Sequence, residues 1–103
     1  MMNNRVIPKQ CPACQAPLCI ERLICHSCTT VVQGNFPLPR LARFTDEEQR
    51  FVELFILCSG SLKSMSSDLG VSYPTVRKRL NALVYKLENE IEKDARSRQQ
   101  EIE

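Results

Sequence analysis

Two Cys-x-x-Cys pairs near the start constrain this chain more than any other feature. Cys11 and Cys14 form the first pair, Cys25 and Cys28 form the second, and ten residues lie between them. A Cys-rich segment of about 36 residues buries too little apolar surface to fold without a metal ion or disulfides. Because two such pairs on separate turns can surround one tetrahedral ion, the sequence predicts a single structural zinc ion (Zn2+) bound by four thiolates.

Other interpretations of the Cys residues have less support. Iron is the minor alternative ion, because a four-thiolate site also suits it. A redox dithiol is a weaker interpretation, because it needs only one Cys pair and because no thioredoxin-like βαβ pattern follows the pairs. We expect Cys19 to be a small packed residue on a first strand, and Cys58 to lie in a helical core. His26 is expected to be an exposed loop residue, because the two pairs already supply four ligands.

The residues around the Cys pairs predict short strands. Residues 18–24 are apolar-rich and long enough for a short hairpin, and residues 29–36 are expected to add a β-branched third strand. This pattern is typical of a zinc ribbon, which we expect to span residues 1–37. Pro37 and Pro39 mark a boundary. Residues 38–44 are therefore expected to be a linker, in which Leu41 and Phe44 tie the ribbon to the next module.

The apolar pattern and the Cys content indicate in which cellular compartment the protein is expected. No signal-peptide core is visible, and no apolar run approaches membrane-spanning length. We therefore expect a cytoplasmic protein without a membrane partner, in a reducing environment where paired Cys residues hold metal more often than they form disulfides.

Charge is unevenly distributed along the chain. The net charge of +2 is too small to argue for nucleic-acid binding by itself. Residues 1–44 carry five basic groups and one acidic group. Residues 45–87 carry six basic and five acidic groups, and residues 88–103 carry three basic and six acidic groups. The front of the chain is therefore basic and the tail is acidic.

A first helix is predicted to start at Thr45. Thr45 and Glu48 have the spacing of a capping box, and acidic residues follow Thr45, where they favour the positive end of a helix dipole. Gly60 is placed to end the helix in a left-handed conformation. One apolar stripe at helical spacing connects these ends: Phe51, Leu54, Phe55 and Cys58.

Residues 61–87 have the pattern of a helix-turn-helix. Ser61 can cap a helix that runs to about residue 69, and Gly70 allows a sharp turn. Ser66 is small enough for the two helices to approach closely. Ser72 can cap the next helix, and Pro74 falls in its first turn, where a missing N–H is tolerated. The helix-turn-helix domain is expected to span residues 45–87.

The last of these helices separates an apolar face from a polar one. Val76, Leu80 and Leu83 fall on the predicted core side. The other side has short polar groups, an amide and cations, which suit a DNA major groove. The residues predicted to contact DNA are Lys63, Ser72, Tyr73, Thr75, Arg77, Lys78, Arg79 and Asn81, with Tyr85 at the edge of the set. The alternative is an ordinary helical hairpin with a solvated charged face.

These residues also carry a resemblance. The segment DLGVSYPTVRKRL resembles the last two helices of the promoter-reading domain (region 4) of bacterial sigma factors and of LuxR-type regulators, which share the pattern LGxSxxTVxxRL. The run from residue 11 to about residue 87 resembles an uncharacterised bacterial family with a four-Cys zinc ribbon, a PRLARL-like linker and a sigma-like helix-turn-helix. The matching pieces are CPAC, CHSC, LPRLARF, DEEQRFVELFILCSGSLK and LGVSYPTVRKRL. The resemblance implies transcription regulation.

The tail, residues 88–103, is expected to be a charged helical extension that frays at its end. Leu80, Val84, Leu87 and Ile91 begin a coiled-coil seam, which polar residues then interrupt. Two interpretations remain open for this tail: a homodimer through the first helix and the C-terminal helix, or a single helix exposed to water.

The sequence features are compared with three classes of function by the chemistry that each requires. The leading hypothesis is a DNA-binding regulator of double-stranded DNA. The second is a protein-interaction module that binds RNA polymerase or a sigma or anti-sigma partner. An enzyme or a redox sensor is not expected, because His26 is the only His, no nucleophile–base set is visible and four protein ligands would close the zinc site.

Overall fold

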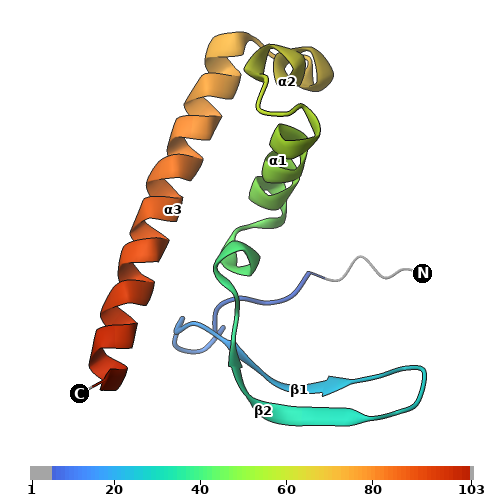
Figure 1. The fold of residues 1–103 in the computed structure, drawn as a ribbon, viewed down its shortest axis with the longest axis vertical. Coiled ribbons are helices and arrows are strands. Elements are labelled where there is room, and N and C mark those ends of the chain that lie inside the picture. Colours follow the sequence, from blue (N-terminus) through green and yellow to red (C-terminus); the bar gives the residue numbers. More distant parts are fainter. Residues whose placement is uncertain (1–5, 103) are drawn as a thin grey trace. The chain divides into compact units, whose positions relative to one another are not determined.

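The computed structural model describes residues 6–102, with side chains to residue 98, and has two units, one up to Arg43 and one from Phe44 (Figure 1). Two strands precede three α-helices, which confirms the predicted order of a ribbon region and a helical region with a long last helix. The elements in chain order are β1 (Cys19–Ile24), β2 (Val31–Pro37), the 3-10 turn η1 (Arg40–Arg43), α1 (Asp46–Leu57), α2 (Leu62–Leu69) and α3 (Tyr73–Ile102).

The ribbon unit is an antiparallel hairpin of β1 and β2, with a bulge in β1 between Ile20 and Arg22. An isolated bridge joins Gln10 to Pro17 ahead of it. The expected hairpin within residues 18–24 was wrong, because CIERLI forms one strand and holds no Gly, Pro or Asn that would favour a turn. The predicted third strand is therefore the second strand, β2.

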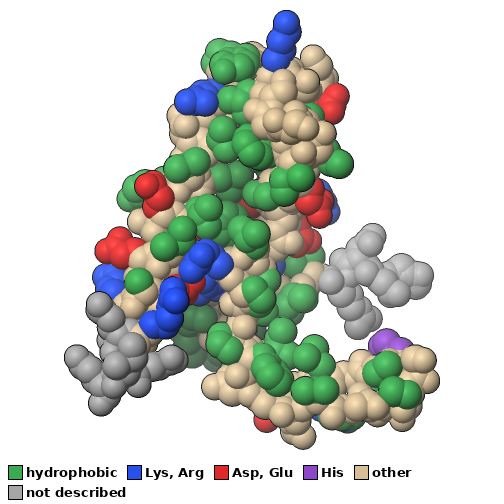
Figure 2. All heavy atoms as spheres, in the orientation of Figure 1, with side chains coloured by type: hydrophobic (Ala, Val, Ile, Leu, Met, Phe, Trp, Pro, Cys, Tyr) green, Lys and Arg blue, Asp and Glu red, His purple; other side chains and the backbone are tan. Residues whose placement is uncertain are grey.

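Little of the ribbon unit is buried. Within its described residues, Leu38 is the only buried hydrophobic side chain. Figure 2 shows the hydrophobic side chains that remain exposed along the hairpin. The prediction that Cys19 is packed was also wrong, since this residue lies on β1 as expected but is exposed. Apolar burial therefore contributes little to the stability of this unit.

The helical unit has a compact apolar core. Met65 and Val76 are completely buried, and Phe44 is 2% exposed. Phe44 was expected in the linker, but it packs with the helices and belongs to their unit. Cys58 and Val71 pack against this core, as predicted. The buried cluster consists of Phe44, Phe51, Leu62, Met65, Val76 and Leu83.

The start of α1 is fixed by the predicted capping box. The Thr45 N–H donates to Glu48 Oε1 at 2.8 Å, and the Glu48 N–H donates to Thr45 Oγ1 at 3.2 Å. The same Glu48 oxygen accepts a hydrogen bond from Lys86 Nζ on α3, and that ammonium lies 5.0 Å from the centre of the Phe44 ring. Glu48 therefore joins the first turn of α1 to α3.

We predict that Glu48 makes the stability of this unit sensitive to acid. Burial raises the pKa of Glu48, but hydrogen bonds from Lys86 and the Thr45 backbone outweigh it and leave the pKa below its ordinary value of 4.5. A depressed carboxyl pKa contributes stability above the unfolded value, and this is lost as pH falls through the folded one. Glu48→Gln retains a cap but removes the charge, so it should cost up to about 1 kcal/mol at pH 7.

Urea unfolding at pH 7 and at pH 3 measures this effect. The difference in free energy of unfolding between the unaltered protein and Glu48→Gln should shrink from pH 7 to pH 3, as the Glu48 carboxylate takes up a proton. Glu53→Gln, on the exposed side of α1, is the matched control and should change little at either pH. Equal stability of Glu48→Gln and Glu53→Gln at pH 7 would contradict the assignment.

The turn between α2 and α3 follows the predicted pattern. Gly70 has a left-handed conformation with φ of 68°, and its N–H donates to the Ser66 carbonyl at 3.0 Å. The Ser66 hydroxyl donates to the Val71 carbonyl, which ties the turn to the end of α2. Ser61 caps α2 through the Ser64 N–H, and Ser72 caps α3 through the Thr75 N–H. A short polar side chain therefore sets the first turn of each helix.

Helix α3 continues to Ile102 over 30 residues, a length of about 45 Å. Fraying of the end of this extension stays a prediction. Ion pairs along the helix, Lys93 with Glu90 at 3.5 Å and Arg96 with Glu92 at 3.9 Å, favour the helical state. Among the described residues, no helix combines the length and apolar character that crossing a bilayer requires.

Candidate nucleic-acid interface and metal-binding turns

The first turns of α3 present a polar face away from the core. At about 100° per residue, Lys78 and Asn81 lie opposite the buried Val76 and Leu83, and Arg77 lies at the flank of this face. All three are exposed, and Tyr85 extends the face by one turn with 69% of its surface exposed. This face therefore combines two cations, an amide and an aromatic ring that the helical core does not use.

The predicted contact residues before this face lie at the start of α3. Ser72 and Tyr73 are exposed. Thr75 is half-buried, and its hydroxyl lies 2.8 Å from that of Ser72. Thr75 thus belongs to the helix cap. Lys63 is exposed in the first turn of α2, the other helix of the motif.

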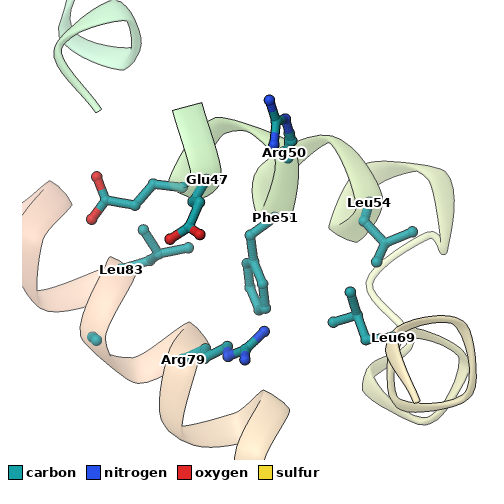
Figure 3. A pocket seen from close by; sticks show the side chains of 9 residues that line it. Glu47, Arg50, Phe51, Leu54, Leu69, Arg79 and Leu83 are labelled. Atoms are coloured by element: carbon teal, nitrogen blue, oxygen red, sulfur yellow. The ribbon is translucent and has the colours of Figure 1, made fainter. Parts of the chain in front are cut away.

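Arg79 lies apart from this face. Figure 3 shows its side chain pointing into a groove between α1 and α3, toward Phe51. The groove has a volume of about 470 Å³. Its floor is apolar and its rim is charged, and its lining comprises Glu47, Glu48, Arg50, Phe51, Leu54, Leu69, Arg79, Ala82 and Leu83. Sequence periodicity missed this groove, because it arises from the spacing between helices.

The two Cys pairs lie on turns with matching backbone hydrogen bonds. The Gln15 N–H donates to the Cys11 carbonyl, and the Thr29 N–H donates to the Cys25 carbonyl, both at 2.8 Å. Gln15 and Thr29 both have positive φ, at 64° and 62°. Each turn closes with a further bond of 2.8 Å, from Cys11 N–H to Ala16 and from Cys25 N–H to Thr30. The repeated geometry makes each turn a two-thiol unit.

Each turn favours the thiolate at one of its Cys residues. Backbone N–H groups of Cys14 and Ala13, with the Cys14 thiol, lower the pKa of Cys11. The Thr30 hydroxyl, 3.0 Å from Cys28 Sγ, lowers the pKa of Cys28 together with the Thr30 backbone and the Cys25 thiol. Since zinc binds thiolates, this donor set fits the ion.

The chain does not bring the four thiols into one site. The first pair precedes β1 and the second follows it, and the six residues of β1 extend about 20 Å. Within the described residues, no three Cys, His, Asp or Glu side chains are grouped so that they could hold a metal ion. The predicted ligands Cys11, Cys14, Cys25 and Cys28 therefore form two separate two-thiol turns here.

His26 and Cys58 are not expected to be metal ligands. His26 is exposed in the second turn, as expected. Burial, followed by the charge of Asp68, raises the pKa of Cys58, whose thiol lies 3.8 Å from an Asp68 oxygen. A raised pKa lowers the thiolate fraction, so Cys58 lacks the usual property of a reactive Cys.

The fold and these sites define a two-module protein with a Cys-paired ribbon and a helix-turn-helix. Residues 11–42 match a family model described as the DUF2089 zinc ribbon, and residues 44–90 match the model described as a domain of unknown function (DUF2089)-HTH. The chain thus has the zinc-ribbon and helix-turn-helix regions of DUF2089 in succession. No curated protein and no solved structure matched the chain.

Proposed function

We propose that this protein is a cytoplasmic DNA-binding transcription regulator whose helix α3 enters the major groove with its first turns. The exposed face of Arg77, Lys78 and Asn81 is the observation that carries the proposal. These side chains follow a left-handed Gly70 turn and a Ser72 cap, in a region that matches a helix-turn-helix model. The resemblance to sigma-factor and LuxR-type domains supports the same assignment.

Each exposed group has a DNA contact that suits its chemistry. Arg77 and Lys78 can reach guanine edges or phosphates, and the Asn81 amide can pair with adenine. Lys63 and the polar start of α3 would position the helix through phosphate contacts. Arg79 contributes less to this proposal, because its side chain lines the groove between α1 and α3.

The ribbon has a structural part in this proposal. One zinc ion per chain would be held by Cys11, Cys14, Cys25 and Cys28. Four thiolate ligands leave no open coordination position, so the ion would stabilise the fold and carry out no catalysis. We accordingly propose a binding function and no enzymatic one.

The groove between α1 and α3 favours a second candidate function. Its apolar floor of Phe51, Leu54 and Leu83 and its charged rim suit a protein partner, such as RNA polymerase or a sigma-related protein. Near-neutral charge over residues 45–87 is compatible with this alternative.

Binding of random duplex DNA tests the proposal. Zinc-loaded protein should bind a labelled 30-base-pair duplex at low salt, and the logarithm of the association constant should fall linearly with the logarithm of salt concentration. Recovery of polymerase subunits from a nuclease-treated extract, without any duplex binding at low salt, would instead favour the protein-interaction function.

A further inference from the structure

The polar face of α3 changes its chemical character along the helix. Side chains seven residues apart on an α-helix lie within about 20° of each other. Lys78, Tyr85 and Glu92 therefore form one row along α3. Asn81 and Glu88 form a second row beside it, and all five side chains are exposed. Along both rows, groups that suit contacts with DNA are followed by a carboxylate.

The two carboxylates lie beyond the reach of a major groove that the first turns of α3 enter. At a rise of about 1.5 Å per residue, Glu88 lies about 15 Å beyond Lys78 along the helix axis, and Glu92 about 21 Å beyond it. The major groove is about 12 Å wide and about 8.5 Å deep. A helix that enters the groove with its first turns keeps both carboxylates outside it. A helix that lies lengthwise on the duplex brings them against phosphates.

The fold does little to neutralise these two carboxylates. Within the described part of the chain, Glu88 has no ion-pair partner. Glu92 lies 3.9 Å from Arg96, but the two side chains are 66% and 65% exposed, so water and salt weaken this pair. Neither carboxylate belongs to the buried core cluster, so packing does not explain their position. Both therefore present negative charge on the same side of α3 as Lys78 and Asn81.

We propose that Glu88 and Glu92 determine how strongly this protein discriminates between DNA sequences, an inference that rests on the proposed DNA-binding function. On the correct sequence, Lys78 and Asn81 reach base edges while the carboxylates stay outside the groove. On other sequences these base contacts are missing, and binding depends on sequence-independent attraction to phosphates. Glu88 and Glu92 repel phosphates and so weaken these complexes. Because specificity is a difference between two affinities, weakening the wrong complex increases it.

Affinity for random duplex DNA tests the proposal. Glu88→Gln/Glu92→Gln removes both charges from the full-length, zinc-loaded protein and keeps the size of the side chains. At low salt, this variant should bind random duplex roughly three- to tenfold more tightly than the unaltered protein, and the gain should shrink as added salt screens the charges. Affinity for a duplex selected from a random library should change by less than about twofold, so that discrimination falls.

Two control variants separate this role from helix stability and from net charge. Glu88→Asp/Glu92→Asp keeps both charges and should bind random duplex like the unaltered protein. Glu21→Gln/Glu53→Gln removes two exposed carboxylates outside α3 and should bind random duplex only slightly more tightly. The proposal would be overturned if Glu88→Gln/Glu92→Gln bound random duplex no more tightly, gained equally on random and selected duplexes, or gained no more than the second control. If the unaltered protein bound no duplex at all, the proposed function would fail with it.

Discussion

Replacing Cys11 and Cys14 with Ser should unfold the ribbon unit and leave the helical unit folded. The ribbon buries one large apolar side chain, Leu38, among its described residues, so metal ligation must supply most of its stability. Structural zinc contributes on the order of 10 kcal/mol in small zinc modules at neutral pH, far more than this hairpin gains by burial. The helical core is independent of these ligands because it is formed by residues from Phe44 onward.

Amide NMR spectra of the zinc-loaded protein measure this effect. Signals of residues 11–37 should collapse to the narrow range of an unfolded chain, while signals of α1, α2 and α3 keep their dispersion. Cys19→Ser is the matched control, because Cys19 is exposed on β1 and lies outside both turns. Unchanged ribbon signals in Cys11→Ser/Cys14→Ser would contradict a metal-dependent ribbon.

Replacing Arg77 and Lys78 with Ala should remove most of the affinity for DNA. The two side chains are exposed on α3 and are not part of the buried core cluster. A contact to a base edge or phosphate is worth about 1–3 kcal/mol, so the double variant should bind roughly 30-fold more weakly or worse. The slope of affinity against salt should also fall by about 1–2.

The control for this variant removes the same charge from the same helix. Lys93→Ala/Arg96→Ala changes two cations that pair with Glu90 and Glu92 along the extension of α3. This control should reduce affinity only slightly, because its effect on the DNA face is long-range and screened by salt. Equal losses in both variants at matched salt would mean that net charge, rather than this face, determines binding.

Local sequence signals predicted the helical unit well. Thr45 with Glu48, Ser61, Gly70 and Ser72 each act through backbone groups within a few residues, so their roles are visible in the sequence. Helical spacing likewise predicted the buried side of α3. The bond from Lys86 to Glu48 spans 38 residues and depends on how α1 packs against α3. No local pattern indicates such a contact.

In the candidate sites too, local sequence predicted some features, and packing between distant segments determined the others. The exposed positions of Arg77, Lys78 and Asn81 follow from helical periodicity, because the opposite side is apolar. The orientation of Arg79 into a groove depends on the neighbouring α1, and spacing along one helix carries no information about it. The spacing of the Cys pairs predicted the type of ligand, whereas their separation by β1 results from the pairing of residues 19–24 with β2.

We propose that the exposed face of α3 reads DNA sequence. Selection of bound duplexes from a random library, with the zinc-loaded protein, tests it most directly. We expect a sequence motif to be enriched over successive rounds, and the enrichment to disappear with Arg77→Ala/Lys78→Ala but persist with Lys93→Ala/Arg96→Ala. A folded, zinc-loaded protein that enriches no motif above the starting library would contradict the claim.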